Sequence, residues 1–230
     1  MGGSLGDILA RAAAGSPPSP DGGLTVLAQP SDRDAGVIAF TAHSVVFANV
    51  TASWVRARIP AGDLSAPMGP RFLQALAERL GRQAGSTDML TVAAALPGPP
   101  GLPLSQVDGS DHPRVRRARR YRDDLVVWAG DGAVVLIGRG VAGRWEVAVE
   151  VDPGRRNEGI GRCAARAARH LVPAGEPLWA QISPGNVASV RAFLAAGFVP
   201  VGGEALLAQG WTAKTAADAS PGRRRAYSWP

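Results

Sequence analysis

An apolar strand, a tight turn and a helix that begins at glycines follow one another directly in residues 145–171. Within 145–151, apolar residues alternate with polar or small ones, which is the period of a half-buried strand. The same order repeats downstream, with a strand at 177–182, a helix at 186–196 and a strand that begins at 198–201. Strands that alternate with helices bury one face of each helix against a sheet. The chain is therefore predicted to fold as an α/β protein with a mixed sheet.

The rest of the 230-residue chain predicts further strands and two helices. The helices are expected near 52–58 and 69–82, the second with Phe72, Leu73, Leu76 and Leu80 on one face. The remaining strands are expected near 24–28, 36–41, 44–50, 89–95, 124–128 and 133–138.

Two segments rich in proline and glycine, residues 15–23 and 97–113, divide the sequence. We therefore expect four parts. They are an N-terminal extension that is mobile (1–23), an N-terminal α/β region (24–110), a core of alternating strands and helices (111–208) and a C-terminal tail (209–230).

The turn after the strand is suited to bind a phosphate group. Backbone N–H groups at a helix N-terminus have no partner within the helix, and the helix dipole adds positive charge there. Gly159 and Gly161 would let a ligand approach that backbone, and Arg155, Arg156 and Arg162 add charge. A diphosphate is the ligand that this arrangement favours. The alternative is an ordinary strand–turn–helix unit with exposed arginines.

Two motifs resemble those of the GNAT N-acyltransferase superfamily. Val151, Pro153, Arg156, Gly159 and Gly161 match its Val-x-Pro and Arg-x-x-Gly-x-Gly acyl-coenzyme-A signature. Asn186, Ser189 and the pair Gly197-Phe198 resemble its later Asn-x-x-Ser … Gly-Phe block. The resemblance covers about residues 124–205. It implies a mixed, mostly antiparallel sheet flanked by helices, here with an N-terminal extension. It also implies direct transfer of an acetyl or other acyl group from acetyl-coenzyme A to an amine in a ternary complex.

The resemblance also implies where the coenzyme lies. The coenzyme is expected in a V-shaped opening between the strands at 145–151 and 177–182. Its pyrophosphate is expected in the turn at 156–161. The residues expected to bind it are Val149, Val151, Arg156, Asn157, Glu158, Gly159, Ile160, Gly161, Arg162, Asn186, Ser189 and Arg191.

Proton transfer is assigned to two carboxylates of the coenzyme-binding strand, Glu146 and Glu150. Side chains alternate between the two faces of a strand, so residues two or four apart share a face. Glu146 and Glu150 therefore lie on one face of this strand, and Trp145 lies on the other. We prefer Glu146, because the family often has an acid near the start of this strand, and a β-bulge would bring it into the opening. The alternative is that both are polar residues of the outer face. The family's usual tyrosine acid is replaced by Phe193, which we expect to be a core residue.

The formal net charge is +6, and arginine supplies nearly all of the positive charge. We interpret this as the bias of a GC-rich, bacterial genome. Six arginines lie between Arg114 and Arg122. They indicate either a solvated segment or a contact with an anion, such as the coenzyme 3′-phosphate or RNA. This arginine stretch keeps open a transferase that uses charged tRNA. The replaced tyrosine and the uncertain base keep open a non-catalytic acyl-coenzyme-A-binding domain.

The remaining features indicate a cytoplasmic protein. One cysteine, Cys163, excludes an internal disulfide framework, and we expect it to be buried. The three histidines have no metal-ligand spacing, so no metal is expected. The apolar stretches contain prolines or polar residues that a membrane-spanning helix would not carry, and no signal peptide is expected. We expect an acyl-coenzyme A and an amine, as a small molecule or on a protein, as partners. A homodimer stays open.

Overall fold

The structure is a computed structural model that describes residues 3–108 and 112–209. The α-helices are α1 (Leu5–Ala13), α2 (Ala52–Arg56), α3 (Pro70–Leu80), α4 (Pro113–Ala118), α5 (Ile160–Ala168) and α6 (Val187–Ala195). The strands are β1 (Leu24–Leu27), β2 (Gly36–Phe40), β3 (His43–Phe47), β4 (Arg82–Ala94), β5 (Ser105–Gln106), β6 (Asp123–Gly130), β7 (Ala133–Arg139), β8 (Trp145–Val151), β9 (Pro177–Ile182) and β10 (Val199–Gln209). Three short 3₁₀ helices are η1 (Ala66–Met68), η2 (Val141–Gly143) and η3 (Pro153–Arg155).

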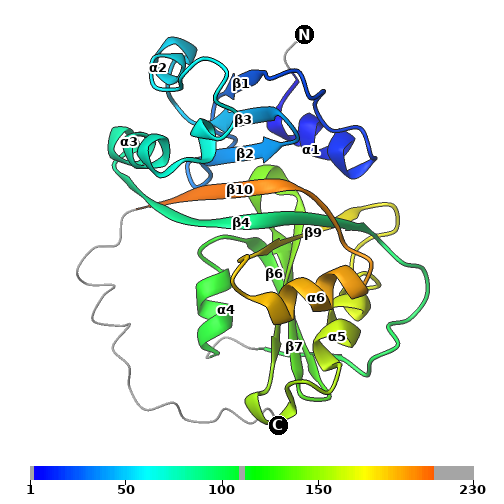
Figure 1. Ribbon diagram of the computed structural model, residues 1–230. Coiled ribbons are helices and arrows are strands. Elements are labelled where there is room, and N and C mark those ends of the chain that lie inside the picture. Colours follow the sequence, from blue (N-terminus) through cyan, green and yellow to red (C-terminus); the bar gives the residue numbers. More distant parts are fainter. Residues whose placement is uncertain (1–2, 109–111, 210–230) are drawn as a thin grey trace.

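All strands join one mixed sheet, in the order β1-β3-β2-β10-β4-β9-β8-β7-β6-β5. Figure 1 shows β4 and β10 crossing the middle of the molecule, with β1–β3 at one end and β6–β8 at the other. Two pairs of neighbours, β1–β3 and β8–β9, are parallel, and the others are antiparallel. The mixed α/β fold expected from the sequence is confirmed.

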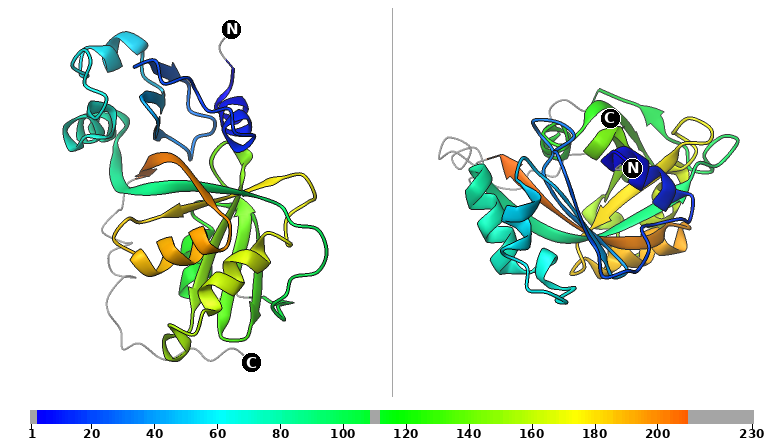
Figure 2. Two further views of the ribbon diagram at one scale, coloured as in Figure 1. Left: turned by 45° about the vertical axis from the view of Figure 1, so that its right-hand side comes forward. Right: turned by 90° about the horizontal axis from the view of Figure 1, so that it is seen from above.

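Helices cover both faces of this sheet (Figure 2). On one face, α5 and α6 pack on β7, β8 and β9, and α2 and α3 pack on β2, β3 and β10. On the opposite face, α4 packs on β6 and β7, and α1 packs on β2, β3, β4 and β9. We call this second side the α4 face. Alternate residues of one strand reach the two faces, because side chains alternate along a strand.

The longest strand, β4, lies between two strands of the C-terminal half. The sequence predicted a strand at 89–95, but β4 begins seven residues earlier, at Arg82. Its first half pairs with β10, and its second half pairs with both β10 and β9. The sheet therefore runs across the boundary that we expected near residue 110.

The expectation that residues 1–23 are mobile is wrong for α1. Ser4 and Asp7 form a reciprocal capping box that fixes the start of this helix. Leu5, Ile8 and Leu9 lie on one face and are buried on the sheet. The helical spacing of these apolar residues gives the helix one apolar face. Burial of that face on the sheet stabilises the helix although the segment is short. Most of the expected C-terminal tail lies outside the described residues.

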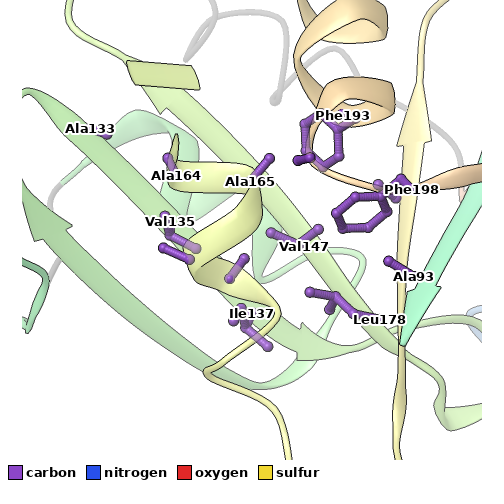
Figure 3. Packing of buried hydrophobic residues seen from close by; sticks show 14 of the residues in the cluster. Ala93, Ala133, Val135, Ile137, Val147, Ala164, Ala165, Leu178, Phe193 and Phe198 are labelled. Carbon is purple, nitrogen blue, oxygen red and sulfur yellow. The ribbon is translucent and has the colours of Figure 1, made fainter. Parts of the chain in front are cut away.

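The largest buried cluster lies between the α5–α6 layer and the sheet (Figure 3). Phe193 and Phe198 meet there edge to face, with ring centroids 4.9 Å apart. Phe193 is 6% exposed, so its expected place in the core is confirmed. Cys163, which we expected to be buried, is exposed on α5. The neighbouring Ala164 and Ala165 form the buried face instead, because the helix turns Cys163 away from the sheet.

Candidate active site

The parallel strands β8 and β9 separate soon after they begin. They pair at Trp145 with Leu178 and at Glu146 with Trp179, and neither strand pairs with the other beyond these two positions. β8 continues to pair with β7 along its whole length, and β9 continues to pair with β4. The polar backbone groups of 147–151 that face β9 therefore have no ladder partner. The two strands diverge where the resemblance implied an opening.

The turn after β8 brings free amides to the end of this divergence. Gly159 has φ of +83° and caps α5, a conformation that favours glycine. A Cβ at Gly159 would meet nothing closer than 4.0 Å, so the space in front of it is open. Within the described part of the chain, no acceptor is found for the backbone N–H groups of 157–161. Exposed amides at a helix N-terminus can hold an anion.

α6 lies beside the first turn of α5. A Cβ at Gly161 would lie 3.6 Å from Val151 and 3.7 Å from Ala192, so the first turn of α5 touches both β8 and α6. Asn186 caps α6, because its side chain accepts the backbone N–H of Ser189 at 3.2 Å. The end of β8, the first turn of α5 and the middle of α6 thus lie together, and Asn186 lies at the start of that same helix α6.

The residues expected to bind the coenzyme differ in exposure. Seven are exposed, namely Arg156, Asn157, Glu158, Gly159, Arg162, Asn186 and Arg191. Four are half-buried, namely Val149, Val151, Gly161 and Ser189. Ile160 is buried among the α5 and α6 core residues, so it offers a ligand its backbone amide and not its side chain. Glu158 is paired with Arg155 at 2.7 Å, whereas no ion pair of Arg156 or Arg162 is found in the described residues.

Glu146 lies at the point of divergence and is 2% exposed. Its Oε1 accepts from Arg144 Nε at 2.9 Å and from Gln181 Nε2 at 2.7 Å, and its Oε2 accepts from Arg122 Nε at 3.1 Å. The backbone N–H of Val141 is a fourth donor, at 3.3 Å. Burial alone would raise the pKa of this carboxyl, but Arg144 and Arg122 outweigh burial and hold the pKa below its ordinary value.

A second buried acid extends this group of charges. Glu204 of β10 accepts from Arg144 Nη2 at 2.7 Å and is 1% exposed. Burial raises the pKa of Glu204, and Arg144 opposes this only in part. Among the described residues, no partner is found for Glu204 Oε1 or Arg144 Nη1. The sequence reasoning missed Glu204 and Gln181. Each of them is a single charged or amide residue inside an otherwise apolar strand, and this was the signal by which the sequence could have identified them.

Two details of the glutamate prediction are corrected. The register between β7 and β8 is continuous from Trp145 to Val151, so the expected β-bulge is absent from this described pair. The face that carries Glu146 and Glu150 is also not simply an outer, solvated face. α4 packs on the same side, and its Arg114 lies 3.6 Å from Glu150, whose side chain is 39% exposed. Two arginines of the stretch 114–122 thus pair with the two glutamates.

Neither a metal site nor a membrane-spanning helix is found in the part of the chain that the structure describes. No group of three or more His, Cys, Asp or Glu residues there is arranged to hold a metal ion. None of its helices is both long and apolar enough to cross a membrane.

No family model and no curated protein matches the sequence. Several solved structures are similar to the chain, and three of them are as follows. A GCN5-related N-acetyltransferase from Kribbella flavida is 19% identical, with a TM-score of 0.38, and the match covers 60% of this chain and 64% of that one. An acetyltransferase of the GNAT family from Colwellia psychrerythraea is 11% identical, with a TM-score of 0.38, and the match covers 76% and 81%.

The third structure, from Novosphingobium aromaticivorans, is 17% identical, with a TM-score of 0.37 over 57% of this chain and 69% of that one. It is also described as a member of the GNAT family. At these TM-scores we take the function from the residues of this chain.

Proposed function

We propose that the protein is an N-acyltransferase that transfers an acetyl or other acyl group from acyl-coenzyme A to an amine. The observation that carries this proposal is the divergence of β8 from β9 beside a turn with unpaired amides. The divergence leaves a strand edge that can pair with an extended pantetheine arm. The amides of 157–161 would hold the diphosphate, with Arg156 and Arg162 adding positive charge.

In this arrangement the amine attacks the thioester carbonyl directly. A backbone amide of the free β8 edge would stabilise the oxyanion that develops on the carbonyl oxygen. Phe193 is buried and has no acidic proton, so the coenzyme thiolate would take its proton from water. A thiol pKa of about 8.5 makes this step a small cost at neutral pH.

The role of Glu146 as a catalytic base stays a prediction. Its four hydrogen-bond donors and lowered pKa favour a different part in the reaction. It would fix the relative position of β8 and β9 at the divergence. Glu150 is better exposed, but it lies beside Arg114.

The decisive experiment measures thiol release from acetyl-coenzyme A over a panel of amines, with the acylated amine identified by mass spectrometry. We expect release that depends on the amine. Coenzyme binding by calorimetry without any amine-dependent release would instead favour the non-catalytic binding domain. Two observations support this non-catalytic alternative. Glu146 is occupied by its hydrogen-bond donors, and Phe193 replaces the family's tyrosine. A steep salt dependence of RNA binding would favour the tRNA-dependent transferase.

A further inference from the structure

Four carboxylates lie on the α4 face around the divergence. Glu204 of β10 is directly opposite Asp88 of β4 in the antiparallel register, so their side chains share a face. Leu90 is opposite Gln181 of β9, and Trp179 is opposite Glu146 of β8, which places Asp88 and Gln181 on the face that carries Glu146. Glu150 lies four residues after Glu146 in the same strand and therefore on the same face, where it is the fourth acid.

Asp88 differs from the other three in its partners. Glu146 is bound by Arg122 and Arg144, Glu204 by Arg144, and Glu150 by Arg114. Asp88 accepts one hydrogen bond, from Ser86 Oγ at 3.0 Å, and forms no ion pair with any described residue. It is half-buried, so it is neither freely solvated nor neutralised. Most of its acceptor capacity therefore remains available to a ligand.

The strand order places Asp88 near the opening between β8 and β9. β4 is the neighbour of β9 on the side away from β8, and α4 packs on the opposite side of the opening, against β6 and β7. Arg117 of α4 lies near enough to Asp88 to act on its charge. By strand order and register, Asp88 and α4 thus flank the divergence of β8 from β9 from its two sides, on the face away from α5 and α6. Figure 1 shows β4 on one side of β9 and α4 beside β6 and β7.

The surroundings make Asp88 a better proton acceptor than an ordinary aspartate. Burial raises its pKa, while the Ser86 hydrogen bond and Arg117 of α4 lower it in smaller measure. Among the described residues, Glu204 lies opposite Asp88 on the paired strand and is itself held by Arg144. Glu146, by contrast, is held by two arginines, and its pKa is lowered.

We propose that Asp88 is the group that binds the acceptor as a cationic primary amine and accepts its proton. This inference rests on the proposed acyl transfer and names its substrate class. A carboxylate that is half-buried and forms no ion pair with any described residue attracts an ammonium group. It offers little to a neutral acceptor.

The proton and electron transfers balance as follows. At pH 7 about one alkylamine molecule in 2,500 is uncharged, for a pKa of ~10.4, so the bound ammonium has to lose a proton before it attacks. That proton passes to Asp88 and then to water at its exposed side. The nitrogen lone pair forms the bond to the carbonyl carbon, and the carbon–sulfur bond breaks with its electron pair on sulfur. The second nitrogen proton reaches the thiolate through water, which gives the amide and free coenzyme A.

The test compares two amines of different charge in the full chain. One is an alkylamine, cationic at pH 7, and the other is an arylamine, neutral at pH 7. Thiol release is measured for the unsubstituted protein, for Asp88→Asn and for Glu78→Gln, which neutralises an exposed carboxylate of α3 as a control. We expect Asp88→Asn to lower kcat/KM for the alkylamine by about 100-fold or more, as loss of a general base does. The arylamine should lose less than about threefold, and Glu78→Gln should change neither.

A pH profile and a binding measurement separate this role from a structural one. With the alkylamine, activity of Asp88→Asn should recover about tenfold per pH unit, because the free base then comes from solution. Coenzyme affinity by calorimetry should stay the same. Equal losses on both amines, or a small loss on the alkylamine, would overturn the role of Asp88 and leave the proposed function intact. No thiol release from the unsubstituted protein with any amine would overturn the proposed function and the inference together.

Discussion

Gln181 donates from Nε2 to Glu146 Oε1 at 2.7 Å, across the two strands that part just beyond Glu146. The contact joins β8 to β9 by side chains at the place where their backbone pairing stops. Arg144 and Arg122 complete the surroundings of the same carboxylate. The geometry of the opening therefore depends on a buried group of charges as well as on the sheet.

Replacement of Glu146 by glutamine should destabilise the fold. The variant leaves Arg122 and Arg144 without a carboxylate that they both contact, and breaking a buried pair in this way costs roughly 3–5 kcal/mol. Urea unfolding at pH 7 measures the difference. Glu150→Gln is the matched control on the same strand. Because Glu150 is 39% exposed and 3.6 Å from Arg114, it should cost less than about 1 kcal/mol.

The same pair of variants should show a pH dependence of defined sign. The pKa of Glu146 is lower in the folded protein than its ordinary value of 4.5. Its stabilisation is therefore complete above that value and is lost as the pH falls towards the folded pKa. Between about pH 5 and pH 3, the unfolding free energy should fall more steeply for the unsubstituted protein than for Glu146→Gln. Parallel curves would show that Glu146 is not held as a carboxylate.

Gly140→Ala should displace Glu146. A Cβ at Gly140 would overlap the Glu146 carboxyl group, and that side chain is fixed by four donors. Overpacking of this kind typically costs about 1–3 kcal/mol. Gly101→Ala, where a Cβ would meet nothing within 4 Å, should stay within about 0.5 kcal/mol of the unsubstituted protein. Equal stability of the two variants by thermal unfolding would contradict the packing around Glu146.

Gly159→Asp should weaken the binding of acyl-coenzyme A at least tenfold by calorimetry. The change places a negative charge in front of the free amides of 157–161 and also strains a backbone with φ of +83°. Gly159→Ala carries the strain without the charge, so the difference between the two variants reports the electrostatic effect. Gly154→Ala, in open space of the same turn, is the unstrained control. Unchanged affinity in Gly159→Asp would remove the diphosphate from this turn.

Phe193 should contribute packing and not proton transfer. Phe193→Ala should cost roughly 3–5 kcal/mol, because the ring is buried against Phe198. Phe193→Tyr should leave the rate of thiol release nearly unchanged. A rate raised tenfold or more, about 1.4 kcal/mol in the barrier, would show that protonation of the thiolate limits the native protein.

Local patterns in the sequence were enough for the strand–turn–helix units of the C-terminal half. β8 and β9 have the predicted bounds 145–151 and 177–182, because apolar alternation, prolines and glycines act over a few residues. The turn with Gly159 could be predicted for the same reason. A glycine that begins a helix after a strand specifies local backbone geometry.

Tertiary structure alone decided what surrounds the two predicted glutamates. The parity of β8 placed Glu146 and Glu150 on one face, but Arg122, Gln181 and Glu204 reach that face from segments up to 58 residues away. Pairing of β4 with β9 and β10 also brought Asp88 to it. Such neighbours depend on strand order and register. These are set by long-range packing of whole elements, and no short stretch of sequence contains them.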